Sequence, residues 1–408
     1  MHANAEQYGL AGCTASPERR HRRPCWDEAA FRGKRVDIER RAYILGSMRR
    51  AFLSAILALL AAGCATDPYS QLETPTPTLS PTQVAELQKR AKTPEELGFQ
   101  MVVNERSAGF AGVNVIDARG NATLPLVEIP SEKPKESGGL YRVPIIVASV
   151  NGNADVRVML DSGSNQNLLG YTLSHNLGIP VIAGLKPMTG YGIGGAVDNY
   201  GAIVPTMQMG SINFQKMVAM IGPDEQVLTL TRHFWSSTQV MILGVNALRS
   251  LSYLTIDSPR GNVILGVRDA YLPDDTLTFM TTAPLHWVGQ LPAVEISVDG
   301  REPVTCILDT GGDYGMLLPR ARAVEWGYWN PGKGRLAIPG GVGGASLAAS
   351  YEINKAKVGG ANFVHIPGRT GLIGPEVGGG KAVFLGNVAL RRYRVTFDFK
   401  HSVVWLER

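Results

Sequence analysis

Short runs of alternating apolar and polar residues, separated by glycine-containing turns, dominate the chain after its first third. Residues 143–163 contain two such runs around Asn151-Gly152, and residues 291–311 contain two more around Asp299-Gly300. Alternation with a period of two is typical of β-strands that bury one face. Asn-Gly and Asp-Gly suit the two-residue turns of β-hairpins. The pattern therefore predicts one β-hairpin in each segment.

The two hairpin segments are copies of one another. Residues 143–163 and 291–311 align without a gap at an offset of 148, with eight identities in 21 positions. Further matches follow in the same order: 176–179 with 325–328, 191–196 with 340–345, 243–244 with 385–386, and Asp257 with Asp398. Ordered matches of this kind indicate an internal repeat. We expect two copies of one β-rich lobe, at 138–268 and 286–408, joined by an interlobe linker at 269–285.

A hydrophobic run near the N-terminus has a different character. Residues 48–63 comprise a methionine, two arginines, a 12-residue apolar run and a glycine, and Cys64 follows. This order is that of a signal peptide, and the run is too short for a permanent transmembrane helix. The ending resembles a bacterial lipoprotein signal, in which the cysteine is lipidated, although Ala61 replaces the usual leucine. We predict a lipid anchor at Cys64; an ordinary secretory signal is the alternative.

The segments around this signal show no lobe-like pattern. Residues 1–47 are rich in arginine and lack an apolar period, so we interpret them as an over-extended leader. Residues 64–137 form a predicted tether and an unassigned N-terminal segment. In it, 74–82 alternates proline with hydroxyl residues, which favours an extended spacer, and 83–92 has modest helix character. Two roles are open for 95–137: adding a strand or covering a groove.

Composition and charge exclude some classes of function. Hydrophobic residues make up 44% of the chain and charged residues 18%, which is typical of a globular protein. The formal net charge of +5 arises entirely in residues 1–63, because the remainder holds 29 basic and 29 acidic residues. A nucleic-acid-binding protein carries its basic excess in the folded part. We therefore expect no nucleic-acid partner.

The cysteines fit an anchored protein without disulfides. Cys13 and Cys25 lie in the leader and Cys64 is the predicted anchor, which leaves Cys306 alone in the mature chain. No intramolecular disulfide is then available. Cys306 lies in an apolar run, so we expect a buried, unreactive thiol.

An aspartate follows an apolar run in each repeat and precedes a hydroxyl residue and a glycine. The two motifs are Asp161-Ser162-Gly163 and Asp309-Thr310-Gly311. A carboxylate at the end of a buried strand is costly unless it is compensated, and glycine lets backbone N–H groups approach it. The hydroxyl can hydrogen-bond within its loop or across to the partner lobe. Two lobes related by an approximate two-fold axis would bring the carboxyls together, where they share a proton and hold a water. One carboxyl is then a base for the water and the other an acid.

These features resemble the aspartic proteases of the pepsin and retropepsin group, specifically a single-chain bacterial protein with two retropepsin-like lobes. The resemblance rests on the paired motifs, a glycine-rich segment about 30 residues after each, and a later apolar-apolar-glycine at 242–244 and 384–386. It covers 143–265 and 291–406. It implies an all-β, bilobal acid-protease fold of two homologous retropepsin-like β-barrel lobes with pseudo-two-fold symmetry. It also implies an aspartic endopeptidase that acts on envelope proteins or peptides without cofactor or metal.

Site residues follow from the resemblance by position. The implied catalytic dyad and its supporting residues are Asp161 and Asp309, with Ser162, Gly163, Thr310 and Gly311. The implied substrate contacts lie in two flap tips and one acidic position: Tyr191, Gly192, Gly194, Gly195, Gly341, Gly343, Gly344 and Asp313. The chain departs from the family pattern at Asn165, Gly312, Val245 and Asn387. Because one chain supplies both halves, we expect an active monomer, lipid-anchored in the bacterial cell envelope and facing the periplasm.

Other motifs are weaker. Residues 190–195 match a dinucleotide-binding fingerprint, but no helix pattern follows. Residues 374–381 have the wrong spacing for a phosphate loop, and the histidines lack metal-ligand spacing. The open alternative is a catalytically silent, peptide-binding lipoprotein of the same fold. Such a protein need not retain both aspartates and both hydroxyl residues, and this chain retains all four.

Overall fold

The computed structural model describes residues 76–104, 107–118, 120–127, 143–192, 195–224, 239–329, 335–337, 340–341, 344–345, 348–371 and 380–408. All of them belong to one compact unit, Thr74–Arg408. The predicted leader, the signal peptide and Cys64 lie outside the described residues. None of the helices within the described ranges is long and apolar enough to cross a membrane.

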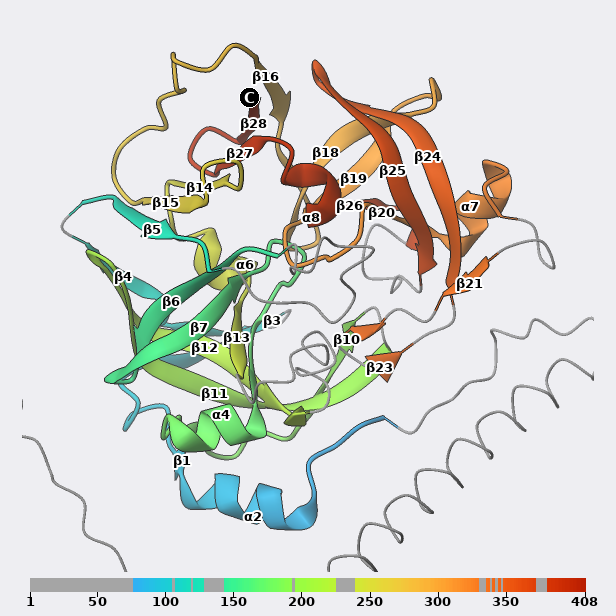
Figure 1. Ribbon diagram of the computed structural model, residues 1–408. Coiled ribbons are helices and arrows are strands. Elements are labelled where there is room, and N and C mark those ends of the chain that lie inside the picture. The colour runs from blue at the N-terminus through green and yellow to red at the C-terminus, as the bar shows by residue number, and fades with distance from the viewer. Residues whose placement is uncertain are drawn as a thin grey trace, which may run out of the picture. The chain divides into compact units, whose positions relative to one another are not determined.

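Strands from the first repeat, together with two short strands from the segment before it, form one large sheet, drawn mainly in green in Figure 1. Its order in the described residues is β1 (Ala91–Lys92), β9 (Val181–Ile182), β11 (Gly195–Met209), β6 (Ile145–Val150), β7 (Asn153–Leu160), β13 (Val240–Leu243), β8 (Asn167–Gly170), β12 (Ile212–Gly222) and β4 (Val115–Ala118), with β10 (Met188–Gly192) paired to β11. Two short helices, α4 (Tyr171–Asn176) and α6 (Val245–Leu248), follow β8 and β13.

Strands from the second repeat form a matching sheet, drawn in orange in Figure 1. Its order, for the part of the chain described, is β17 (His286–Val288), β18 (Leu291–Val298), β19 (Val304–Asp309), β26 (Val383–Gly386), β20 (Met316–Pro319), β25 (Ala361–Gly371), β24 (Ala348–Val358) and β21 (Arg335–Ala337). The helices α7 (Arg320–Glu325) and α8 (Asn387–Leu390) follow β20 and β26. The structure is thus mainly β, and its two sheet groups fit the two predicted lobes.

The repeat extends to strand pairing and core. β7 pairs in parallel with β13, as β19 does with β26, and β8 pairs in parallel with β12, as β20 does with β25. The core residues correspond by position: Ile145, Met159, Leu168, Val240 and Ile242 in one lobe, and Ala293, Ile307, Leu317, Ala382 and Phe384 in the other. Both predicted hairpin turns are confirmed, with positive φ at Asn151-Gly152 and at Asp299-Gly300.

A third sheet takes strands from both repeats. Its order is β16 (Met280–Pro284), β28 (Val403–Glu407), β27 (Arg394–Asp398), β14 (Tyr253–Asp257), β15 (Asn262–Gly266) and β5 (Ala122–Pro125). β14 and β27 pair antiparallel about Thr255 and Thr396, whose hydroxyls are 2.8 Å apart. β5 and β16 occupy equivalent edges, so each lobe contributes three strands. These two strands come from the segments predicted as unassigned and as a linker.

A buried charged network lies beside this shared sheet. The Arg394 guanidinium is 3.7 Å from Asp257, 3.1 Å from Asp274 and 3.9 Å from Glu407. Tyr271 donates a hydrogen bond to Glu407, which is fully buried. Since the arginine and Glu407 come from the second repeat and Asp257 from the first, the network links the two lobes.

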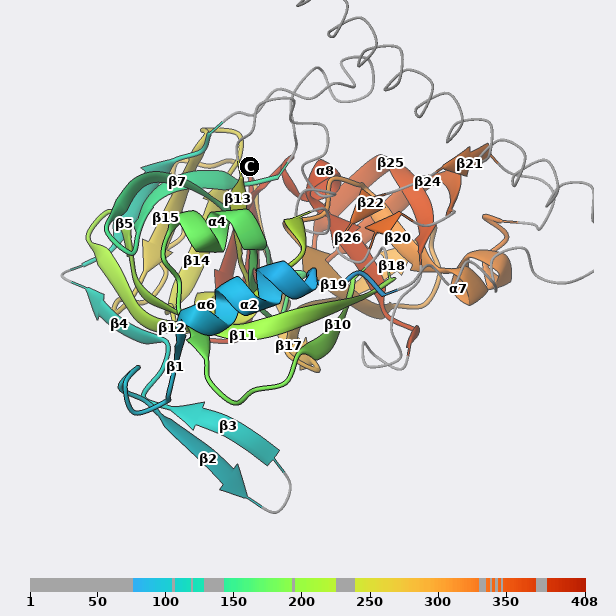
Figure 2. The same cartoon turned by 90° about the horizontal axis from the view of Figure 1, so that it is seen from below.

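The segment before the first lobe packs onto it. Helix α2 (Pro81–Lys89) begins two residues before the predicted helical run because Ser80 caps it and Pro81 suits its first position. The Arg90 side chain donates to two backbone carbonyls of the lobe at 2.6 and 2.9 Å. The Pro77 carbonyl accepts from Asp198 N–H in β11 at 3.1 Å. Figure 2, seen from below, shows α2 in front of the first lobe and a separate hairpin of β2 (Gln100–Asn104) and β3 (Ser107–Ala111).

Candidate active site

Each aspartate leaves its sheet at the same point of the fold. Asp161 follows β7 directly, and its N–H donates to the carbonyl of Leu243 in β13 at 3.0 Å. Asp309 is the last residue of β19 and pairs with Gly386 in β26. In both lobes the strand that leads to the aspartate is therefore held by a parallel neighbour with a glycine at its end: Gly244 directly follows β13, and Gly386 is the last residue of β26.

The two motif loops are joined by reciprocal hydrogen bonds. The Ser162 hydroxyl donates to the Leu308 carbonyl at 2.5 Å and accepts from Thr310 N–H at 3.0 Å. The Thr310 hydroxyl donates to the Leu160 carbonyl at 2.7 Å and accepts from Ser162 N–H at 3.0 Å. Both side chains are buried. These four bonds cross from one lobe to the other and fix the two loops against each other.

The carboxyl groups of Asp161 and Asp309 are in hydrogen-bonding contact. They are 9% and 6% exposed. A methyl group built on Gly163 would collide with the Asp309 carboxylate, and one built on Gly311 with that of Asp161. Each glycine therefore leaves the space that the opposite carboxylate occupies. Gly163 N–H also donates to Asp161 Oδ1 at 2.8 Å.

Burial and mutual repulsion determine how this pair ionises. Burial raises the pKa of Asp161 well above its ordinary value, and the charge of Asp309 raises it further. Burial also raises the pKa of Asp309, but hydrogen bonds from Tyr314 and Asp161 oppose that rise. Two carboxylates in contact cannot both ionise cheaply. The pair therefore tends to hold one proton between its two members.

Tyr314 is a member of the site that the sequence reasoning missed. Its hydroxyl donates to Asp309 Oδ2, and the side chain is buried. A Cβ atom on Gly312 would lie 2.5 Å from the Tyr314 ring, and one on Gly386 would lie 2.6 Å from it. The departure from the family pattern at Gly312 thus has a physical reason, because the ring fills the space of a side chain there. The repeat held a signal for this residue: the first lobe has Gln166 at the position of Tyr314, so the two lobes differ here.

The predicted flap tips belong to two hairpins with the same register. In the first lobe, Gly192 in β10 pairs with Gly195 in β11, whose φ is 121°. In the second, Gly341 in β22 (Gly340–Gly341) pairs with Gly344 in β23 (Gly344–Ala345). Tyr191 pairs through its backbone with Ala196; its side chain, like Gly194 and Gly343, lies outside the described residues. Asp313 is half-buried in the loop that follows β19.

Cys306 is buried as predicted, and burial raises the pKa of its thiol far above the usual range. A protonated, inaccessible thiol is a poor nucleophile. Across the described part of the chain, no group of three or more histidine, cysteine, aspartate or glutamate side chains could hold a metal ion.

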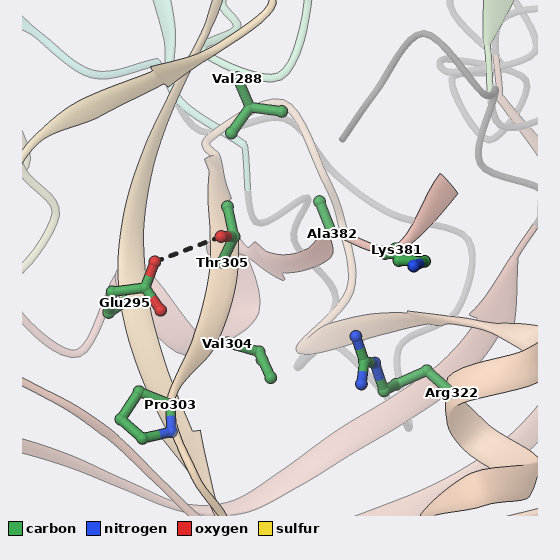
Figure 3. A pocket seen from close by; sticks show the side chains of 8 residues that line it. All are labelled: Val288, Glu295, Pro303, Val304, Thr305, Arg322, Lys381 and Ala382. Atoms are coloured by element: carbon green, nitrogen blue, oxygen red, sulfur yellow. Dashed lines mark hydrogen bonds between the residues drawn. The ribbon is translucent and has the colours of Figure 1, made fainter. Parts of the chain in front are cut away.

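A cavity of about 380 Å³ lies in the second lobe, away from the aspartates. Figure 3 shows Thr305 donating to Glu295 on one side of it, with Arg322 and Lys381 on the other. Thr305 lies four residues before Asp309 on β19, or about 13 Å of extended strand. The cavity therefore lies near the other end of that strand from the paired carboxyls.

A comparison with protein families matches part of the first lobe. Residues 146–247 match the model of a family described as aspartyl protease. The match runs from β6 through most of α6 and includes the first aspartate motif. No curated protein matches the chain.

Proposed function

We propose that this protein is an aspartic endopeptidase that hydrolyses peptide bonds in envelope proteins or peptides. One observation carries the proposal: Asp161 and Asp309 lie in contact, both buried, in loops locked by reciprocal hydrogen bonds. The family match at 146–247 supports the same reaction class.

The pair supplies one base and one acid to the same reaction. The ionised carboxylate takes a proton from a bound water, whose oxygen attacks the carbonyl carbon of the peptide, while the protonated carboxyl gives its proton to the carbonyl oxygen. The tetrahedral intermediate then loses its C–N bond, and the leaving nitrogen takes up a proton from the dyad. A proton from the intermediate's hydroxyl returns to the other carboxyl. The products are a carboxylic acid and an amine, and the dyad again holds one proton.

The surroundings suit a peptide substrate. The two glycine-paired hairpins at 188–209 and 340–345 match the flap positions of the family, and glycine permits close approach of a substrate backbone. Closure of such hairpins excludes water from the reacting groups. Both motifs come from one chain, so the active form is a monomer.

The reaction is tested with isosteric variants of the full chain. Wild type, Asp161→Asn and Asp309→Asn are incubated with a mixture of unfolded proteins between pH 3 and 8, and new termini are identified by mass spectrometry. Asp117→Asn, an exposed aspartate in β4, is the matched control. Cleavage by wild type and control, with none by either dyad variant, is the expected result.

A second arm separates the protease from the silent peptide-binding alternative. A peptide analogue with a secondary alcohol in place of the scissile carbonyl imitates the tetrahedral intermediate, and its binding is measured by calorimetry. Wild type that binds the analogue but cleaves nothing at any pH would show the silent alternative. Specific activity that rises with enzyme concentration would contradict the monomer.

We also propose a lipid anchor at Cys64 that holds the protein in the bacterial cell envelope, facing the periplasm. The charged start, apolar run and Gly63-Cys64 ending support it. Cys64→Ser should release the protein from sedimented membranes or block processing, whereas Cys306→Ala should leave it sedimenting. Unchanged sedimentation of Cys64→Ser would contradict the anchor.

A further inference from the structure

The two halves of the site differ in how they hold their carboxylates. Asp161 accepts from the backbone N–H groups of Gly163 and Ser164, and Asp309 accepts from those of Gly311 and Gly312. These contacts correspond between the lobes. Asp309 has in addition the Tyr314 hydroxyl on Oδ2.

The first lobe offers no equivalent tyrosine. Gln166 stands at the matching position, and the Ser164 hydroxyl donates to the Gln166 carbonyl at 2.8 Å. The serine that follows the first motif therefore stabilises its own loop. The hydrogen bond from the Tyr314 hydroxyl to Asp309 is therefore a departure from the approximate symmetry of the site.

The second lobe is shaped around the tyrosine ring. Glycines at 312 and 386 leave the room that the ring fills, and the ring packs in the core cluster with Ile307 and Phe384. Tyr314 is 7% exposed. A ring packed closely at both glycines holds its hydroxyl in one place, so the hydrogen bond to Asp309 is built into the fold.

We propose that Tyr314 is a positioning residue that assigns the roles in the dyad: Asp309 is the ionised member that takes the proton from water, and Asp161 carries the shared proton. This inference rests on the proposed function and extends it. A hydrogen bond to an ionised acceptor is about twice as strong as one between neutral groups. Tyr314 therefore favours the microstate in which the charge lies on Asp309.

The remaining groups at the site also favour a charged Asp309 and a protonated Asp161. Burial and the charge of Asp309 raise the pKa of Asp161, which keeps that carboxyl protonated. Burial and the same charge raise the pKa of Tyr314 well above its ordinary value, so the phenol remains a donor throughout the working range. The other titratable group facing the tyrosine is the buried thiol of Cys306, which is neutral for the same reason.

The test compares Tyr314→Phe with Tyr393→Phe. Phenylalanine keeps the ring between the two glycines and removes only the hydroxyl. Tyr393 is a buried tyrosine of the same lobe, and its hydroxyl donates to the Asn362 carbonyl at 2.8 Å, away from the dyad. Loss of the donor destabilises ionised Asp309, so the dyad loses its first proton at a higher pH.

The acid limb of kcat/KM in Tyr314→Phe should move upward by about one to two pH units, which is the strength of one hydrogen bond to a charged group. The control should keep the wild-type profile. An acid limb that stays in place in a folded Tyr314→Phe enzyme would overturn the inference.

A readout that needs no activity separates this inference from the proposed function. Carbon-13 NMR of labelled aspartate carboxyls in the wild type should show Asp309 carrying most of the lower titration step and Asp161 most of the upper step. The reverse order would overturn the inference whether or not the protein cleaves peptides. Wild type that shows the expected order but cleaves nothing would instead overturn the proposed function.

Discussion

Replacing Thr310 with alanine removes one of the two hydroxyls that join the motif loops. That hydroxyl donates to the Leu160 carbonyl at 2.7 Å and accepts from Ser162 N–H at 3.0 Å, and the threonine is 1% exposed. Alanine leaves both backbone groups buried without a partner. Thr310→Ser keeps the hydroxyl and loses only a methyl group, which makes it the matched control.

The expected loss of stability follows from counting these groups. A buried polar group left unpaired costs about 1–3 kcal/mol, so two of them cost about 2–6 kcal/mol in Thr310→Ala. The methyl group lost in Thr310→Ser is worth about 1 kcal/mol. Since a typical domain is stable by about 5–15 kcal/mol, the alanine variant should lose a large share of its free energy of unfolding, and the serine variant little.

Urea unfolding followed by tryptophan fluorescence and circular dichroism measures this difference at neutral pH. The midpoint of Thr310→Ala should fall well below that of Thr310→Ser, with a similar dependence on urea. Ser162→Ala should behave like Thr310→Ala, because its hydroxyl makes the reciprocal pair of bonds. Equal midpoints for Thr310→Ala and Thr310→Ser would refute the reasoning that these bonds hold the loops together.

Three further predictions concern the site and the shared sheet. Burial raises the pKa of Asp161, so above about pH 4 the unfolded chain releases this proton while the folded state keeps it, and the folded state loses stability as the pH rises. The Tm of Asp161→Asn should therefore exceed that of wild type by a margin that grows as the pH rises above about 4, and parallel curves would contradict this. Gly312→Ala should cost about 1–3 kcal/mol and lower kcat by pushing on Tyr314, whereas Gly120→Ala, which meets no atom within 4 Å, should do neither. Arg394→Leu leaves the fully buried carboxylate of Glu407 without the arginine, whereas Asp257 and Asp274 keep Arg260. The variant should lose about 3–5 kcal/mol in urea unfolding; a loss below 1 kcal/mol would show that the network does not stabilise the fold.

Local patterns predicted the parts of the fold that local physics decides. Asn151-Gly152 and Asp299-Gly300 adopt positive φ, as two-residue hairpin turns require. The repeat then indicated which strands correspond, and the two sheets follow it through the pairing of β7 with β13 and of β19 with β26. The roles given to the site residues stay predictions until the variants are measured.

These local patterns could not predict strand partners that lie far apart in the sequence, the start of helix α2 or the role of Tyr314. β5 and β16 are short strands whose partners, β15 and β28, lie more than 100 residues away along the chain, so alternation alone could not place them in one sheet. Helix α2 was placed too late because its start depends on the cap at Ser80 rather than on apolar spacing. Tyr314 was missed because spacing along the sequence does not show where its hydroxyl lies, and its role depends on the contact of that hydroxyl with Asp309.

The joining of both lobes in one polypeptide has a consequence for how the site can vary. In a dimer of identical subunits, any substitution occurs on both sides of the axis at once. Two tyrosines would then face two aspartates, and the proton would have no preferred side. In this chain Tyr314 and Gln166 occupy matching positions. Covalent fusion thus allows the surroundings of the two carboxyls to differ, because each half of the chain supplies its own residues.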